Sequence, residues 1–170
     1  DEHGLQETRF AEPLALTQHA CQHATRWANV YGASSPTDLA TVGSAFGLHP
    51  LVQEDILNNA QRQKLDAYED YLYLVLHRYE VQGNVLDLVQ DQISLIIGRD
   101  YVLTFQERPS RTFEPIRQRL RNGHNSLRKG GVDMLAYSLI DTVVDSYFGV
   151  IEQLNDYAEK LEDEILGRDR

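Results

Sequence analysis

The stretch FGLHPLVQEDILNNAQRQKLDAYEDYLYLVL, residues 46–76, predicts a short helix followed by a strand. Proline suits the first turn of a helix, so we expect the helix to begin at Pro50, and four of the next seven residues are apolar. From Lys64 onward the periodicity changes, and Tyr71–His77 is rich in the aromatic and branched residues typical of strands. This order indicates a fold that mixes helices with a sheet.

Short apolar runs on both sides of this stretch predict further strands. Turn signals at Gln82-Gly83-Asn84 and Gly98-Arg99-Asp100 join neighbouring runs closely, which favours a largely antiparallel stretch of sheet. The strands that we expect are Pro13–Leu16, Arg26–Val30, Tyr71–His77, Val85–Leu88, Gln92–Ile97 and Tyr101–Phe105.

Three further helices are predicted. Ser35 can cap a helix that begins at Pro36 and ends at Gly47, and residues 113–120 form a short basic helix. In residues 131–166 apolar positions recur at threes and fours, which predicts one amphipathic helix of about 50 Å. A helix longer than its domain needs usually packs against something else, so we expect its partner in the C-terminal part of a longer protein.

Length and composition indicate one domain covering residues 1–170, with a disordered end at residues 1–11. The net charge of -10 argues against nucleic acid as a partner. Cys21 is the only cysteine, which excludes an intrachain disulfide and a cysteine-based zinc cluster. No apolar run approaches the roughly 18 residues that span a bilayer.

Two pairs of carboxylates are candidate metal ligands. Glu54 and Asp55 are adjacent on the predicted short helix, and Mg²⁺ prefers such oxygen ligands. Asp141 and Asp145 are four residues apart on the long helix, so both project from one face, where a bound cation would relieve their repulsion. From spacing alone, an ordinary solvated surface is the favoured interpretation of both pairs, because acids are favoured near a helix N-terminus and are common on surfaces.

Other charged and titratable groups suggest less specific roles. Residues 132–170 carry a net charge of -7, and residues 108–129 carry +6, so we expect the basic segment to balance the acidic helix within or between chains. The histidines are interpreted as surface residues: His3, His19, His23, His49, His77 and His124. No arrangement singles out a catalytic set, so we expect no enzyme.

Several ordered motifs resemble the cytoplasmic domain of the CorA magnesium and cobalt transporters. They are FGLHPL at 46–51, the Glu54-Asp55 pair, QRxK at 61–64 and YEDYL at 68–72, then DQISLIIGRDYVLTFQE at 91–107, FEPIRQRLR at 113–121 and LAYSLIDTVVDSYFGVIEQLNDYAEKLEDEIL at 135–166. The likeness covers about residues 26–166, with Gln63 where the family usually shows proline.

The resemblance implies a three-layer α/β/α sandwich with a mixed, partly antiparallel sheet and a long C-terminal helix. It also implies a regulatory domain at the cytoplasmic face of the inner membrane, which gates a pore through Mg²⁺, or also Co²⁺, bound between subunits of a pentamer. The positions that match the family's ligands are Glu54, Asp55 and Asp141, and Asp145 is a less favoured candidate. This reverses the preference drawn from spacing alone.

The same resemblance implies that the stalk helix, which carries the partner carboxylate from the adjacent subunit, lies beyond Arg170. The pore helix and the selectivity signature also lie there, so that the membrane is contacted only through those C-terminal helices. Without the stalk, the fragment can be a monomer. Two alternatives stay open: the cytoplasmic domain of a related zinc transporter, in which carboxylates matter less, and a soluble binding module on the same fold.

Overall fold

The computed structural model describes residues 4–19, 24–32, 35–83, 87–123 and 125–168. Its elements in chain order are α1 (Pro13–Gln18), β1 (Arg26–Tyr31), α2 (Pro36–Ala45), α3 (Pro50–Leu57), β2 (Lys64–Ala67), β3 (Tyr71–Val81), β4 (Leu88–Gly98), β5 (Tyr101–Gln106), α4 (Glu114–Arg121), α5 (Asn125–Lys129) and α6 (Gly131–Arg168).

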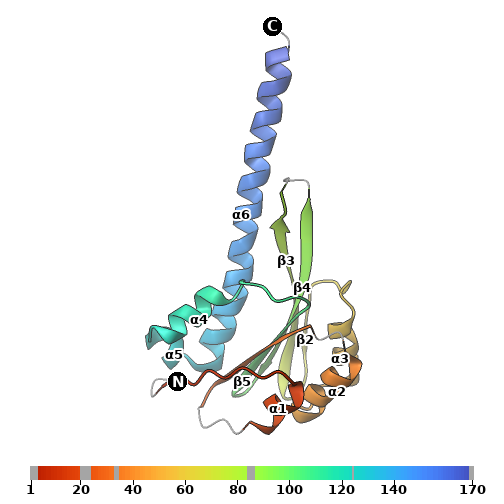
Figure 1. Ribbon diagram of the computed structural model, residues 1–170, viewed down its shortest axis with the longest axis vertical. Coiled ribbons are helices and arrows are strands. Elements are labelled where there is room, and N and C mark those ends of the chain that lie inside the picture. The colour runs from red at the N-terminus through yellow and green to blue at the C-terminus, as the bar shows by residue number, and fades with distance from the viewer. Residues whose placement is uncertain (1–3, 20–23, 33–34, 84–86, 124, 169–170) are drawn as a thin grey trace.

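The five strands form one mixed sheet in the order β1-β5-β4-β3-β2 (Figure 1). β1 is parallel to β5, and every other neighbouring pair is antiparallel. Antiparallel neighbours can be joined by tight turns, whereas the parallel pair requires the long connection through the rest of the sheet. The mixed, partly antiparallel sheet expected from the sequence is confirmed.

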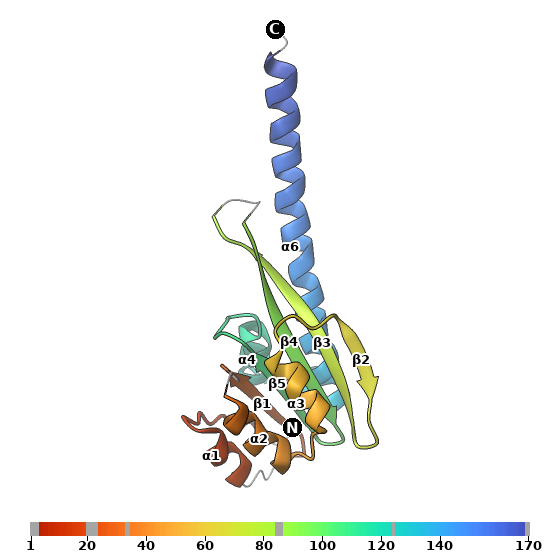
Figure 2. The same cartoon turned by 90° about the vertical axis from the view of Figure 1, so that its right-hand side faces the viewer.

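Helices cover both faces of this sheet, which gives three layers (Figure 2). Leu95 and Ile96 of β4 belong to different cores, as expected for a strand that is covered on both faces. The core under α2 and α3 contains Leu39, Val42, Val52, Ile56, Tyr73, Val75, Ile96 and Leu103. The core under α4, α5 and α6 contains Ile93, Leu95, Val102, Phe113, Ile116, Leu127, Val132, Leu135, Leu139 and Val143. The predicted α/β/α sandwich is confirmed.

The helix ends follow local sequence signals. Ser35 Oγ accepts a hydrogen bond from the Asp38 amide at 3.4 Å, and so caps α2 as expected. Gly47 has φ +64°, a conformation that ends the helical path at little cost for glycine. His49 caps α3, because its Nδ1 accepts from the Leu51 amide at 3.2 Å.

One of the predicted strands is wrong, and two others belong to one strand. Pro13–Leu16 lies in helix α1, because proline in the first turn and the good helix formers after it outweigh a short apolar run. Val85–Leu88 and Gln92–Ile97 are not separate strands; β4 is continuous from Leu88, and Val81 pairs with Leu88 in the expected hairpin. Residues 84–86 lie outside the described residues.

Helix α6 is 38 residues long, and its two halves have different surroundings. Val132, Leu139 and Val143 are buried against the sheet. After Val150 the helix continues past the sheet, and its apolar residues Ile151 and Ile165 are exposed (Figure 1). The long helix expected from the sequence is therefore present, and its distal half has no cover within the described chain.

By length and composition alone, one helix among the described residues, Gly131–Gly167, could cross a membrane. The sequence criterion of an uninterrupted apolar run missed it, because Asp141 and Asp145 interrupt the run. A third of its most apolar window is buried inside the fold (33%), as in a helix that covers a sheet. The helix is therefore weak evidence for a membrane span.

Candidate divalent-cation site

The adjacent carboxylates of α3 lie in the last turn of that helix. Val52 and Ile56 are buried against the sheet, which leaves Glu54 exposed and Asp55 half-buried at the edge of the contact. The sequence interpretation placed this pair near a helix N-terminus, where the dipole favours acids, and that placement is wrong. At a C-terminal end the dipole disfavours negative charge and favours cations. The pair therefore needs donors or cations close by.

Both oxygens of Asp55 have such partners, one in the loop that follows α3 and one at the start of β2. Gln61 Nε2 donates to Oδ1 at 2.5 Å, and Lys64 Nζ donates to Oδ2 at 2.6 Å. Lys64 also pairs with Asp66 Oδ2 at 2.9 Å. The hydrogen bonds to Asp55 and then Asp66 raise the pKa of the Lys64 ammonium above its usual value. A permanent cation therefore lies directly against the candidate metal ligand.

Contacts to the sheet hold this loop in place. Gln92 Nε2 donates to the Asp55 carbonyl at 3.1 Å, and His77 Nε2 lies 2.8 Å from the Gln61 carbonyl. His77 and Gln92 are paired residues of β3 and β4, so one place on the sheet contacts both the last turn of α3, at Asp55, and the loop, at Gln61. His77 is only 9% exposed, so its interpretation as a surface residue is wrong. Cys21, His3, His23 and His124 lie outside the described residues.

The second pair of predicted ligands is on the other side of the sheet. Asp141 and Asp145 are exposed on α6, whereas Asp55 is on α3, and these helices cover opposite faces (Figure 2). Among the described residues, no three His, Cys, Asp or Glu side chains form a group that could hold a metal ion. One chain therefore does not bring the predicted ligands together.

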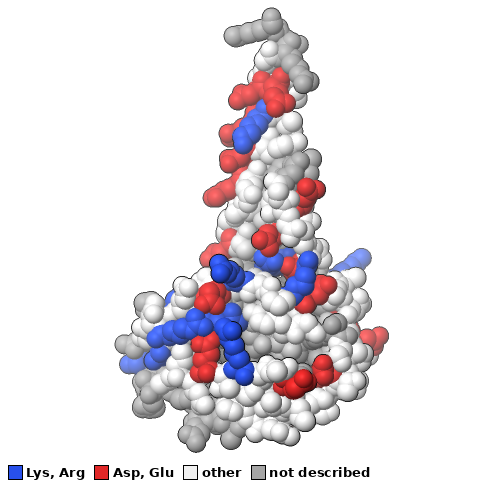
Figure 3. Space-filling model, in the orientation of Figure 1, with Lys and Arg blue, Asp and Glu red and all other residues white. Residues whose placement is uncertain are grey.

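The basic segment pairs with acids outside α6. Arg121 binds Glu7 at 2.7 Å and Glu114 at 2.8 Å. Arg128 donates to the Leu120 carbonyl at 2.8 Å from Nε. Figure 3 shows acidic side chains along the protruding part of α6, apart from most of the arginines. The contacts of these arginines therefore do not support charge balance with α6 within one chain.

An ionic cluster around the buried Asp91 has no counterpart among the sites predicted from the sequence. Asp91 accepts hydrogen bonds from Arg78 at 2.6 Å and from Arg108, and its residue is 9% exposed. Burial opposes ionisation of the carboxyl group, but the two guanidinium groups outweigh it and lower the pKa of Asp91. Arg78 and Asp91 are paired across β3 and β4. The register of the two strands brings these residues together, and local spacing in the sequence does not reveal that register.

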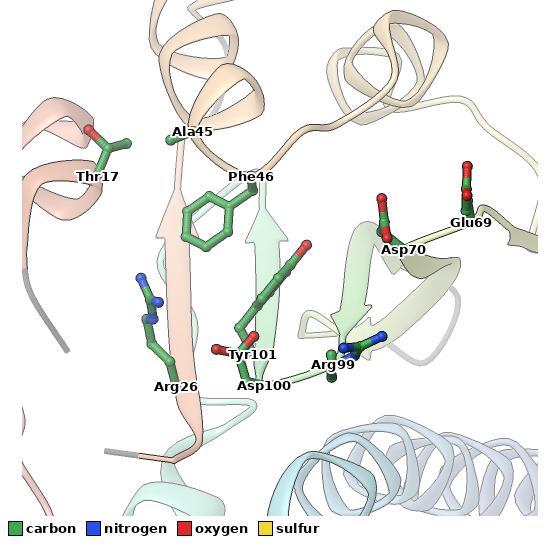
Figure 4. Close-up of a pocket in the computed structure, with 9 residues that line it drawn as sticks. All are labelled: Thr17, Arg26, Ala45, Phe46, Glu69, Asp70, Arg99, Asp100 and Tyr101. Carbon is green, nitrogen blue, oxygen red and sulfur yellow. The ribbon is translucent and has the colours of Figure 1, made fainter. Parts of the chain in front are cut away.

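An open pocket of about 610 Å³ lies at the end of the sheet where β3 begins and β4 ends. Figure 4 shows the rings of Phe46 and Tyr101 between Arg26 on one side and Glu69 and Asp70 on the other. Charges of both signs line it, and neither the rings nor the acids form a metal-ligand set. The pocket is separate from the Asp55 site.

Comparison with known proteins decides the family. The sequence model of the CorA-like Mg²⁺ transporter protein family matches residues 22–170. The chain belongs to this family. The cobalt/magnesium transport protein CorA of Thermotoga maritima is 42% identical over 142 residues, which are 84% of this chain and 40% of that protein. The chain thus spans less than half the length of this CorA relative.

Solved structures show the same CorA-like fold. The soluble domain of CorA from Methanocaldococcus jannaschii matches with a TM-score of 0.66 and 16% identity, over 83% of this chain and 55% of that one. The ZntB cytoplasmic domain from Vibrio parahaemolyticus matches with a TM-score of 0.58 and 19% identity, over 77% and 54%. At these identities the likeness concerns the fold alone.

The geometry gives the CorA-like motif at residues 61–64 a structural role. In QRxK the first and last residues, Gln61 and Lys64, are the two that bind Asp55. Gln63, which stands where the family usually shows proline, takes no part in those two contacts. The departure therefore leaves the arrangement around the carboxylate intact.

Proposed function

We propose that this chain is the cytoplasmic, divalent-cation-sensing domain of a CorA-like transporter of Mg²⁺ and Co²⁺. Membership of the family and the 42% identity to a cobalt/magnesium transport protein support this proposal. In the full-length protein we expect the domain to lie at the cytoplasmic face of the inner membrane, in a pentamer. The pore and stalk would belong to a part of that protein outside residues 1–170.

The observation that carries the sensing role is the placement of the acids. Glu54 and Asp55 lie on one face of the sandwich and Asp141 on the other, and their oxygens are the donors that Mg²⁺ prefers. Acids on opposite faces of one subunit can meet only across a boundary between two subunits. We infer that the two sets of acids contribute to cation sites between subunits, with different copies supplying them.

The proposed regulation follows from linkage. Bound Mg²⁺ would neutralise carboxylates that face each other across the boundary, and so stabilise the arrangement of subunits to which it binds. Without that charge, Asp55 and Asp141 of neighbouring copies repel, which favours a looser arrangement and an open gate. Weak individual sites suffice, because the coupling adds up over several boundaries.

The test is a calorimetric Mg²⁺ titration of the full-length protein and of its Asp55→Asn variant. We expect weak binding in the parent and its loss in the variant, because the variant removes a ligand. Asp163→Asn is a matched control, since this acid is exposed on the distal half of α6. Binding that is equal in the parent and in Asp55→Asn would contradict the assignment.

The zinc-transporter alternative shares this fold, so the fold does not separate the two functions. The described histidines of the site region do not favour it: His49 caps α3 and His77 holds the Gln61 carbonyl. Transport of Zn²⁺ but not Mg²⁺ by the full-length protein would establish the alternative. A soluble module would be established if the full-length protein stayed out of the membrane fraction.

A further inference from the structure

Lys64 and Asp66 lie on the same face of the edge strand β2, two residues apart and directed toward α3. Lys64 Nζ lies 2.6 Å from Asp55 and 2.9 Å from Asp66, and 5.4 Å from the centre of the Tyr73 ring. The ammonium is thus shared between two carboxylates. One of the two, Asp55, is a ligand of the proposed sensor.

We propose that Lys64 competes with the divalent cation for Asp55, and so sets the concentration at which the sensor responds. The inference rests on the proposed function and adds a regulatory residue to it. An ammonium and a Mg²⁺ ion cannot both contact the same carboxylate oxygen without strong repulsion between them. Divalent binding at Oδ2 of Asp55 therefore requires Lys64 Nζ to move away.

Asp66 gives Lys64 a place to move to. Its carboxylate already contacts Nζ, and its side chain is 41% exposed, compared with 16% for Asp55. When a cation takes Asp55, Lys64 keeps one ion pair and the nearby Tyr73 ring. The competitor is therefore displaced without becoming an isolated charge, and it returns when the divalent cation leaves.

This arrangement also explains how the isolated domain tolerates Asp55 in the last turn of α3. Without a metal, Lys64 supplies the positive charge that the helix end and the carboxylates favour. The same charge lowers the apparent affinity for Mg²⁺. A sensor of this kind remains folded when it is empty and responds only when the cation is abundant.

The test follows Mg²⁺ titration of the full-length protein by NMR, using the Lys64 Nζ and Asp55 carboxyl signals. As Asp55 becomes occupied, we expect the Lys64 Nζ signal to move in parallel. Lys64→Gln should tighten the apparent dissociation constant by about two- to fivefold, the range that partly exposed ion pairs carry. Lys64→Arg should bind Mg²⁺ as the parent does, and Lys160→Gln controls for the loss of one distant positive charge.

The Asp66→Asn variant distinguishes competition by Lys64 from a general electrostatic effect of losing the Asp66 charge. If Asp66 acts as the second position of Lys64, this variant weakens Mg²⁺ binding in the parent and has little effect in the Lys64→Gln background. An equal effect in both backgrounds, or a Lys64 Nζ signal that does not move while Asp55 is occupied, overturns the inference.

The outcomes distinguish the two proposals. If the Asp55 carboxyl signal responds to Mg²⁺ but Lys64→Gln binds no more tightly than the parent, only the competition fails. If the Asp55 signal responds in neither the parent nor Lys64→Gln, Asp55 is not a cation ligand in this chain and both proposals fail at this residue.

Discussion

At the scale of single residues, Asp91 shows how the sheet tolerates a buried charge. Its carboxylate is held by Arg78 and Arg108, so each of its oxygens has a guanidinium partner. Arg78 depends on it in turn, because most of its side chain is also covered. Removing the Asp91 charge leaves Arg78, which is mostly covered, with Glu80 as its remaining acidic partner, whereas Arg108 is largely exposed and can be solvated.

We expect Asp91→Asn to lower the free energy of unfolding by roughly 1.5–3 kcal/mol, the range of hydrogen bonds to charged groups. The pKa of Asp91 is below the ordinary 3.8 when the chain is folded. Its contribution is therefore complete above that pH and is lost as the pH falls through the lower, folded-state pKa. Urea unfolding at neutral pH and at pH about 3, followed by circular dichroism, should show a smaller difference between parent and variant in acid. An undiminished difference would contradict this account.

Individual contacts were also the least predictable level of the structure. The Lys64–Asp55 pair joins residues nine apart across a loop, and no periodicity of helix or strand connects them. The burial of His77 depends on the Gln61 carbonyl that it contacts. By contrast the cap at Ser35 was predictable, because its partner Asp38 is three residues away.

At the scale of elements, predictability followed the strength of the local pattern. The aromatic and branched run of β3 marked a strand, and the turn signal after it predicted a hairpin, but not the register with β4. The edge strand β2, with the polar sequence KLDA, gives no such signal and was not assigned. The Pro13–Leu16 run was too short to separate a strand from a helix by periodicity.

Helix α6 offers a test of how burial is distributed along one element. Leu139 is fully buried under the sheet, while Leu161 is 40% exposed on the distal half. Leu139→Ala should destabilise the chain by about 2–5 kcal/mol, because it removes buried methyl groups and leaves a cavity. Leu161→Ala on the same helix is the matched control and should stay within about 0.5 kcal/mol. Both are measured by urea unfolding, and a similar loss in the two variants would show that the distal half is covered in solution.

At the scale of the whole molecule, the sandwich keeps its acids apart. α3 and α6 lie on opposite faces, and the sheet between them prevents the Asp55 and Asp141 carboxylates of one chain from meeting. The sequence suggested these residues only through the family resemblance. The fold adds a geometric reason why a shared site would need two copies.

If Asp55 and Asp141 contribute to one site between subunits, their substitutions should not be additive. We expect Mg²⁺ to raise the thermal stability of the full-length protein, and Asp55→Asn or Asp141→Asn each to remove most of that rise. The double variant should then lose little more than either single variant, because one missing ligand already abolishes the site. Thermal unfolding at equal ionic strength, with Na⁺ replacing Mg²⁺, separates specific binding from screening. Losses that simply add would mean that the two carboxylates bind cations independently, and the two-copy site would then have to be abandoned.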